Sequence, residues 1–161
     1  MIYTSPYFSE LLLSQAVFSH DLPREPFTTA FRDNFELRYE GVRYDALSSS
    51  QRDLLLRLVE VHIGRIRPGH AELKMAEVKR HLSQTYFAWM GGVEQDSVFY
   101  YRVHSPVIII EFDHQRGQAF PQYEKPYRDH IHIVVRTPNG NDYGKDLLRQ
   151  HYEQSPHHAA K

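Results

Sequence analysis

Three strand-like runs in the C-terminal half constrain the fold more than any other feature of this sequence. The runs are "SVFYYRVHS", "PVIIIEFDH" and "HIHIVVRT", each bounded by proline, glycine or polar turn residues. Side chains alternate between the two faces of a strand, so each run presents one apolar face and one face that carries ionisable residues. The alternation predicts that these ionisable faces gather on one side of one sheet. They carry Arg102, His104, Glu111, Asp113, His130, His132 and Arg136.

Helical patterns precede these strands. "SSSQRDLLLRLVEVHIGRI" begins with serine capping candidates, and its apolar spacing predicts a helix. Its expected buried face consists of Leu54, Leu55, Leu58, Val61 and His62. A second, more polar helix is expected over residues 69–83. Its expected buried set is Leu73, Met75, Ala76, Val78 and Leu82.

The remaining patterns complete the predicted fold. "TYFAWMGG" predicts a strand, "ELRYEGVRYDAL" a strand broken at Gly41, and "NDYGKDLLRQHY" a short C-terminal helix. The sequence therefore predicts an α+β fold, in which N-terminal helices pack on a C-terminal antiparallel β-meander. We expect one such domain over residues 41–154, an extension with a short helix over 1–40, and a disordered tail over 155–161.

Composition excludes several classes of partner. The formal net charge of −1 provides no bulk field for nucleic acid or an anionic membrane, so neither is expected as a partner. No apolar run approaches the length that spans a bilayer, and the N-terminus lacks a basic leader, so cytoplasm is the default location. Cysteine is absent, so any bound metal needs nitrogen and oxygen ligands.

Two of the histidines, His130 and His132, suit a metal site on the ionisable face. With one acid from "EFD", they form a set typical of divalent zinc, iron, manganese or copper, with positions left open for water or substrate. His114 is a candidate third nitrogen ligand, although strict alternation places it with Phe112 on the apolar face. A solvated sheet face with cross-strand charge pairs predicts the same residues without any metal.

The metal hypothesis leads to a metal-dependent enzyme of hydrolase or oxygenase type, acting on a small molecule. The candidate catalytic residues are Glu111, Asp113 and Arg136, with an acid as general base. The candidate substrate-binding residues are Arg102, Arg128, Asn139, Asn141 and Tyr143, with the arginines holding a carboxylate or phosphate. The alternative is a non-catalytic binding module, either a homo-oligomer or a subunit of a larger assembly. "TPNGNDYG" fits both, because a β-turn and helix cap would also present its side chains to the face.

Long segments resemble a known family. "RHLSQTYFAWMGG", "FYYRVHSPVIIIEFDHQ" and "RDHIHIVVRTPNGNDYGKDLLRQHY" are similar to the DUF3500 family, over about residues 41–152. Members are usually longer, which implies the C-terminal portion or a short form of the family. The resemblance groups these segments and adds no catalytic residue. "HIHIVVR" is also similar to the histidine triad of nucleotide hydrolases, but Val134 occupies the third position, and we set that reading aside.

Overall fold

In the computed structural model, the described residues are 15–29, 36–117 and 124–138. They form one sheet and two α-helices, which confirms the expected α+β class. The strands are β1 (Val17–Ser19), β2 (Val42–Arg43), β3 (Tyr86–Gly91), β4 (Phe99–His104), β5 (Ile109–Arg116) and β6 (Pro126–Arg136). The helices are α2 (Ser49–Ile63) and α3 (His70–Arg80), with 3-10 turns at Tyr44–Ala46 and Leu82–Gln84.

The four long strands lie in sequence order across the sheet. β3, β4, β5 and β6 pair with their neighbours in antiparallel register, while β2 (antiparallel) and β1 (parallel) both pair with β3. β6 begins at Pro126, earlier than the expected run, because β5 continues to Arg116 and pairs with Pro126 across an irregularity. The expected C-terminal helix lies outside the described residues.

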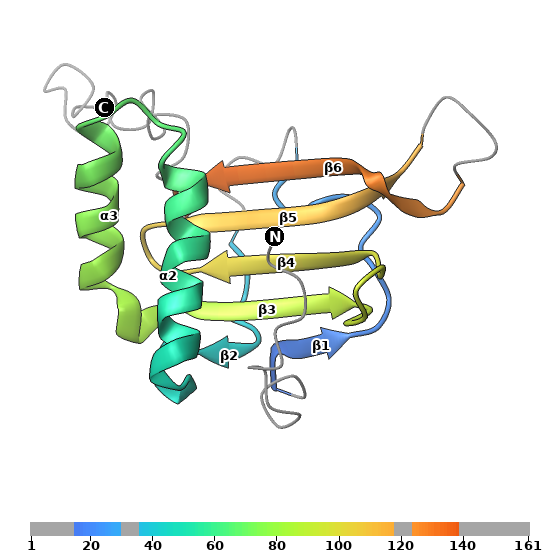
Figure 1. Cartoon of the computed structure of the whole chain (residues 1–161), viewed down its shortest axis with the longest axis horizontal. Coiled ribbons are helices and arrows are strands. Elements are labelled where there is room, and N and C mark those ends of the chain that lie inside the picture. Colours follow the sequence, from blue (N-terminus) through green and yellow to red (C-terminus); the bar gives the residue numbers. More distant parts are fainter. Residues whose placement is uncertain (1–14, 30–35, 118–123, 139–161) are drawn as a thin grey trace, which may run out of the picture.

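α2 lies on one face of the sheet, here called the helix face (Figure 1). α2 crosses one end of the strands, and α3 lies beside it. The main core fills the space between α2 and the sheet. It contains, among others, Leu55, Leu58, Val59, Ile63, Val78, Phe87, Val103, Ile108 and Ile110. Burial of these apolar side chains is the main stabilising contribution to the fold.

α2 forms as the sequence predicts. The Ser48 side chain accepts from the backbone of Gln51, whose own side chain accepts from the Ser48 backbone, so a capping box closes the N-terminus. The predicted buried face is wrong at Val61, which is 52% exposed. The helix turns Val59 and Ile63 toward the sheet in its place.

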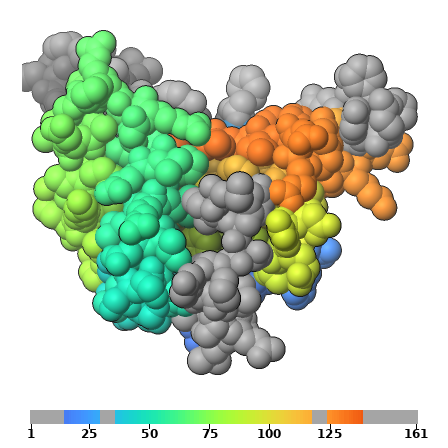
Figure 2. All heavy atoms as spheres, in the orientation of Figure 1, coloured from blue at the N-terminus to red at the C-terminus, as the bar shows by residue number. Residues whose placement is uncertain are grey.

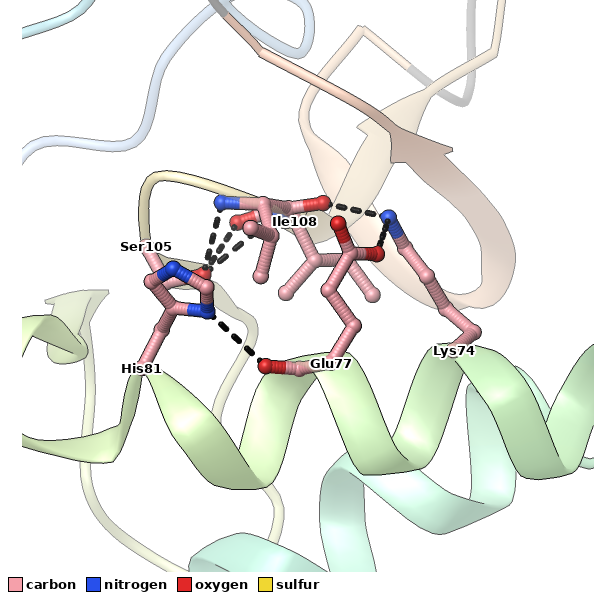
Figure 3. A network of polar contacts seen from close by, with 6 residues as sticks. Lys74, Glu77, His81, Ser105 and Ile108 are labelled. Carbon is pink, nitrogen blue, oxygen red and sulfur yellow. Dashed lines mark hydrogen bonds and ion pairs between the residues drawn. The ribbon is translucent and has the colours of Figure 1, made fainter.

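α3 is attached to the turn that joins β4 and β5 (Figure 3). Lys74 Nζ donates to the carbonyl oxygen of Val107 at 2.6 Å and to Glu77 at 2.8 Å. Ser105 Oγ accepts from the backbone of Ile108 and shapes the turn itself. Because α3 packs mainly through Val78, Leu73 is 72% exposed, and its predicted burial is wrong.

The N-terminal part of the chain contributes to the sheet and to its second face. β1 pairs with β3, and the chain then passes behind the sheet, on the face away from α2 and α3 (Figure 1). Residues 20–29 of this passage are called the strap below. The strand expected around Gly41 is reduced to β2. A side chain at Gly41, whose φ is 86°, would clash with the backbone of Phe87 at 2.1 Å, so glycine is required there.

Among the described strands, β6 is an edge strand of the sheet. α2 and α3 do not extend over most of its length in the space-filling view (Figure 2). Its helix-face side chains Ile131, Ile133 and Val135 are therefore exposed, although their alternation predicts contact with helices. Among the described residues, no helix has the length and apolar character needed to cross a membrane.

Candidate functional site

The face opposite the helices is the predicted ionisable face, and it is called the polar face below. The register aligns Arg102 with Glu111, and Asp113 with both Tyr100 and His132. The polar face comprises Tyr100, Arg102, His104, Glu111, Asp113, Gln115, His130, His132 and Arg136. The strap and residues 38–40 contact the part formed by β4 and β5, which divides the face into a sealed part and an open part.

Glu111 is the centre of the sealed part. It is 0% exposed and accepts four hydrogen bonds. The donors are the Phe27 amide at 2.7 Å, the Thr28 amide at 2.9 Å, the Thr28 hydroxyl and the Tyr100 hydroxyl at 2.8 Å. Burial and the Glu111 charge raise the pKa of Tyr100, so the phenol stays a donor. Glu111, a predicted catalytic residue and candidate general base, is thus buried beneath the strap and holds it.

Arg136 holds the strap from the other side. Its Nη1 atom donates to the carbonyl oxygen of Thr28 at 2.6 Å. Thr28 is therefore held at its amide by β5 and at its carbonyl by β6. The structure places Arg136, a predicted catalytic residue, in contact with the protein backbone.

Arg102 is buried between β4 and the N-terminal segments. It is 1% exposed, and its Nη2 atom donates to Glu40 at 2.6 Å and to the carbonyl oxygen of Arg38 at 3.3 Å. Its guanidinium carbon lies 5.5 Å from the ring centre of Phe27. Nε and Nη1 have no hydrogen-bond partner among the described residues. Arg102 thus bridges β4 to residues 38–40.

His104 lies at the end of the sealed part, stacked on Tyr39 with ring centres 4.2 Å apart. Burial, reinforced by the Arg102 charge, lowers the pKa of His104 to about 4, against weaker opposing effects of the Arg38 backbone and Glu40. The imidazole is therefore neutral near neutral pH. Its Nδ1 atom has no hydrogen-bond partner among the described residues.

We expect the His104→Gln variant to lose part of the acid sensitivity of the fold. The unfolded chain protonates this histidine near the ordinary value of 6.5, while the fold resists protonation until about 4. The contribution of neutral His104 to the free energy of unfolding is therefore complete above the ordinary pKa of 6.5. It is lost as pH falls from there toward about 4, by on the order of 2 kcal/mol. Urea unfolding at several pH values measures the slope of the free energy of unfolding against pH. A slope equal to that of a His20→Gln control would contradict the assignment.

His130 and His132 form the open part of the polar face. Their Nε2 atoms approach each other to 3.1 Å, and their ring planes lie at 88°. Nδ1 of His130 lies 3.0 Å from the carbonyl oxygen of Arg116, so this nitrogen carries the proton and donates. The Nε2 atom of His130 therefore has a free lone pair for its neighbour. Burial and His130 lower the pKa of His132, against an opposing effect of Glu25.

Asp113 lies beside this pair, below the surface. It is 1% exposed; Gln115 donates to its Oδ2 atom, and its Oδ1 atom has no hydrogen-bond partner among the described residues. Burial raises the pKa of Asp113 to about 6; Glu111 and Glu25 add to the shift, while Gln115 and His130 oppose it. A carboxyl group with this pKa exchanges protons near neutral pH.

His114 does not join the other two histidines. It lies on the helix face, where its ring packs edge-on against Phe99 with centres 4.5 Å apart and its Nδ1 atom contacts the Phe99 backbone at 3.0 Å. The predicted set of three histidines is therefore not assembled, because strand alternation continues through His114. Across the described part of the chain, no three histidine or acidic side chains converge as a metal-binding group.

The other predicted substrate-binding residues are dispersed. Arg128 donates to the carbonyl oxygen of Gln95 in the β3–β4 turn. The pKa of His114 is lowered mainly by burial, and the Arg128 charge adds to this effect. Asn139, Asn141 and Tyr143 lie outside the described residues. The strap contacts at Phe27 and Thr28 were missed by sequence reasoning. Pro23 and Pro26 indicate an extended segment, but no local pattern indicates its partners.

Comparison with known proteins identifies one family. A family model described as "Protein of unknown function (DUF3500)" matches residues 7–145. The match includes β1, the strap and the whole sheet. No curated protein and no solved structure matches the chain.

Proposed function

The chain belongs to the DUF3500 family, and from the geometry of its open polar face we propose that it is a metal-dependent hydrolase that acts on a small polar substrate. The observation that carries the proposal is the approach of two imidazole Nε2 atoms to 3.1 Å on an exposed part of β6. Two nitrogen lone pairs at this separation suit one divalent cation bound to both.

The surroundings of His130 support this role. Its Nδ1 atom donates to a backbone carbonyl, as the second nitrogen of metal-binding histidines usually does. That hydrogen bond fixes the tautomer and the ring orientation, so Nε2 is available as a ligand. In the absence of an ion, the His132 Nε2–H group donates to this lone pair.

Asp113 provides the acid–base group beside the proposed ligands. Its Oδ1 atom has no partner among the described residues, and its pKa is raised to about 6 by burial. Such a carboxylate accepts a proton from an attacking water and returns it to the leaving group. A bound divalent ion would polarise the substrate and acidify a water molecule. Acid–base chemistry next to the ligands favours hydrolysis over oxygenation.

Metal binding by the tag-free full chain tests the proposal. Isothermal titration with Mn²⁺ and Zn²⁺ should detect a site in the parent protein, and His132→Ala should abolish it while circular dichroism remains unchanged. His20→Ala, which removes an exposed histidine directly after β1, at the opposite end of the strand order from β6, is the matched control and should bind as the parent does. A parent that binds neither ion, or a His132→Ala variant that binds as the parent does, would overturn the proposal.

Turnover separates the enzyme from its alternative. The loaded protein should hydrolyse at least one member of a panel of aryl esters, amides and phosphoesters, and Asp113→Asn should abolish that activity while metal is retained. Metal binding without hydrolysis across the panel would favour a non-catalytic binding module. One observation favours this second candidate. Three of the predicted catalytic or substrate-binding residues are hydrogen-bonded to the N-terminal segments and so are not available to a substrate: Arg102, Glu111 and Arg136.

A further inference from the structure

The two edges of the sheet differ in how they are protected. An edge strand presents backbone N–H and C=O groups that have no partner strand, and proteins usually keep such strands short or irregular. One edge follows this pattern, because β1 has three residues with an irregular register and β2 has two. β6 has eleven residues, and it pairs with β5 without a break in register from Ile131 to Arg136. Among the described residues, no strand pairs with the outer side of β6.

The side chains of β6 do not protect this edge either. Residues 130–135, "HIHIVV", contain no acidic residue, lysine, arginine, proline or glycine. Ile131, Ile133 and Val135 form a row on the helix face and are 43%, 37% and 40% exposed. A long, regular edge strand with an exposed apolar row is expected to pair with another strand.

Going beyond the proposed function, we infer that β6 pairs with β6 of a second copy of this chain, antiparallel, about a two-fold axis at Ile133. The two sheets then form one continuous sheet. Backbone hydrogen bonds between the two β6 strands and contacts between the two apolar rows hold the copies together. Because the axis is perpendicular to the sheet, the open polar parts of both copies lie on the same side.

The symmetry of such a pair limits its register. A two-fold axis perpendicular to the sheet places each helix-face residue of β6 opposite a helix-face residue of the partner. With the axis at Ile133, this residue lies opposite the partner's Ile133, and Ile131 lies opposite the partner's Val135. All three exposed apolar side chains of each copy therefore meet apolar side chains of the other.

The neighbouring registers match less well. An axis at His132 places Val135 opposite the partner's Asp129, a carboxylate that would lose water on burial. An axis at Val134 places Ile131 opposite the partner's Thr137. The apolar row is therefore self-complementary in one register, which favours a second copy over an unrelated extended peptide. One strand edge and three apolar side chains per copy are fewer than the roughly 20–30 residues of a standard interface, so we expect the dimer to dissociate on dilution.

Sedimentation velocity of the tag-free full chain over a dilution series tests the inference, with a chelator present to prevent metal bridging. The parent should change from dimer to monomer on dilution. Ile131→Lys and Val135→Glu should each weaken the dimer at least about tenfold, because each places a charge opposite an apolar side chain. The control is Leu73→Lys, which changes an exposed apolar residue of α3 and should leave the dimer unchanged. Circular dichroism and urea unfolding verify that each variant folds.

The double variant Ile131→Lys/Val135→Glu tests the register. In the inferred pair the two substituted positions lie opposite each other across the axis, so two ion pairs form between the copies. The double variant should therefore dimerise at least about threefold more tightly than either single variant. Within one copy the two positions are four residues apart, about 13 Å along the strand, and do not compensate each other.

The contrary outcomes are distinct. A dimer that persists in both single variants uses another surface and overturns the inference, and a double variant weaker than both overturns the register at Ile133. A parent that stays monomeric at every concentration also overturns the inference. Hydrogen exchange at β6 then separates the other occupants, since protected outward amides indicate the chain's own residues beyond the described part, and unprotected amides leave the edge to a strand of another protein. Metal binding by His132→Ala tests the proposed function separately, so the two can fail independently.

Discussion

Glu111→Gln is expected to lower the free energy of unfolding by about 3 kcal/mol, because it replaces an acceptor-only group at a site surrounded by donors. The carboxylate accepts from the amides of Phe27 and Thr28 and from the hydroxyls of Thr28 and Tyr100. The amide nitrogen of glutamine would point a donor at one or more of these groups. Urea unfolding at neutral pH measures the loss.

The matched control is Glu60→Gln, which changes an exposed glutamate of α2 in the same way. It should alter stability by less than about 0.5 kcal/mol. Hydrogen exchange locates the effect, since the amides of Phe27 and Thr28 should lose protection first in Glu111→Gln. Equal stability of the two variants would show that Glu111 does not hold the strap.

Asp113→Asn is expected to stabilise the protein at neutral pH. Burial raises the pKa of this carboxyl to about 6 from its ordinary 3.8. As pH rises, the unfolded chain therefore releases this proton before the folded chain does, and the free energy of unfolding falls through that window. Asparagine removes the titration and still accepts the hydrogen bond from Gln115. The expected gain above about pH 6 is about 1–2 kcal/mol, because each unit of pKa difference corresponds to about 1.36 kcal/mol and the cost of burying the asparagine amide offsets part of this gain.

The gain should disappear below about pH 4, where the carboxyl is protonated in both states. Asp96→Asn, an exposed substitution in the β3–β4 turn, should show no such pH-dependent gain. Thermal or urea unfolding across this pH range measures the stability of both variants. A destabilised Asp113→Asn variant at neutral pH would show that the ionised carboxylate has a structural partner. A stabilised variant that has lost hydrolysis is the pattern expected where a catalytic group opposes stability.

The polar face follows from the sequence because it depends on a local rule. In antiparallel strands the alternation of side chains is carried across each pairing, so the faces of β4, β5 and β6 are predictable once the strands are recognised. Arg102, Glu111, Asp113 and His132 therefore lie where alternation places them. His114 follows the same rule and lies on the helix face against Phe99. A role as a ligand beside His130 and His132 would have needed a break in the alternation, and the strand has none at this residue.

The division of that face into sealed and open parts was not predictable in the same way. It depends on contacts between the strap and the sheet, and no periodic pattern in "PREPFTT" indicates a carboxylate on β5 as its partner. The hydrogen bonds of Glu111 and Arg136 to Thr28 are therefore contacts that the sequence does not indicate. Helical periodicity had a similar limit. It located α2 and α3, but burial of Val61 and Leu73 depends on which side of each helix packs against the rest of the fold.

The double anchoring of Thr28 also bears on how the chain folds. Its two sheet partners lie 83 and 108 positions further along the sequence, at Glu111 and Arg136. Contacts of such long sequence separation form slowly, because a large loop must close before they stabilise anything. During synthesis the strap emerges before β5 and β6, so Thr28 has neither of its two sheet anchors until these strands have been made. The docking of the strap is therefore expected to be a late step of folding, and the side of the sheet beneath it stays open to solvent until then.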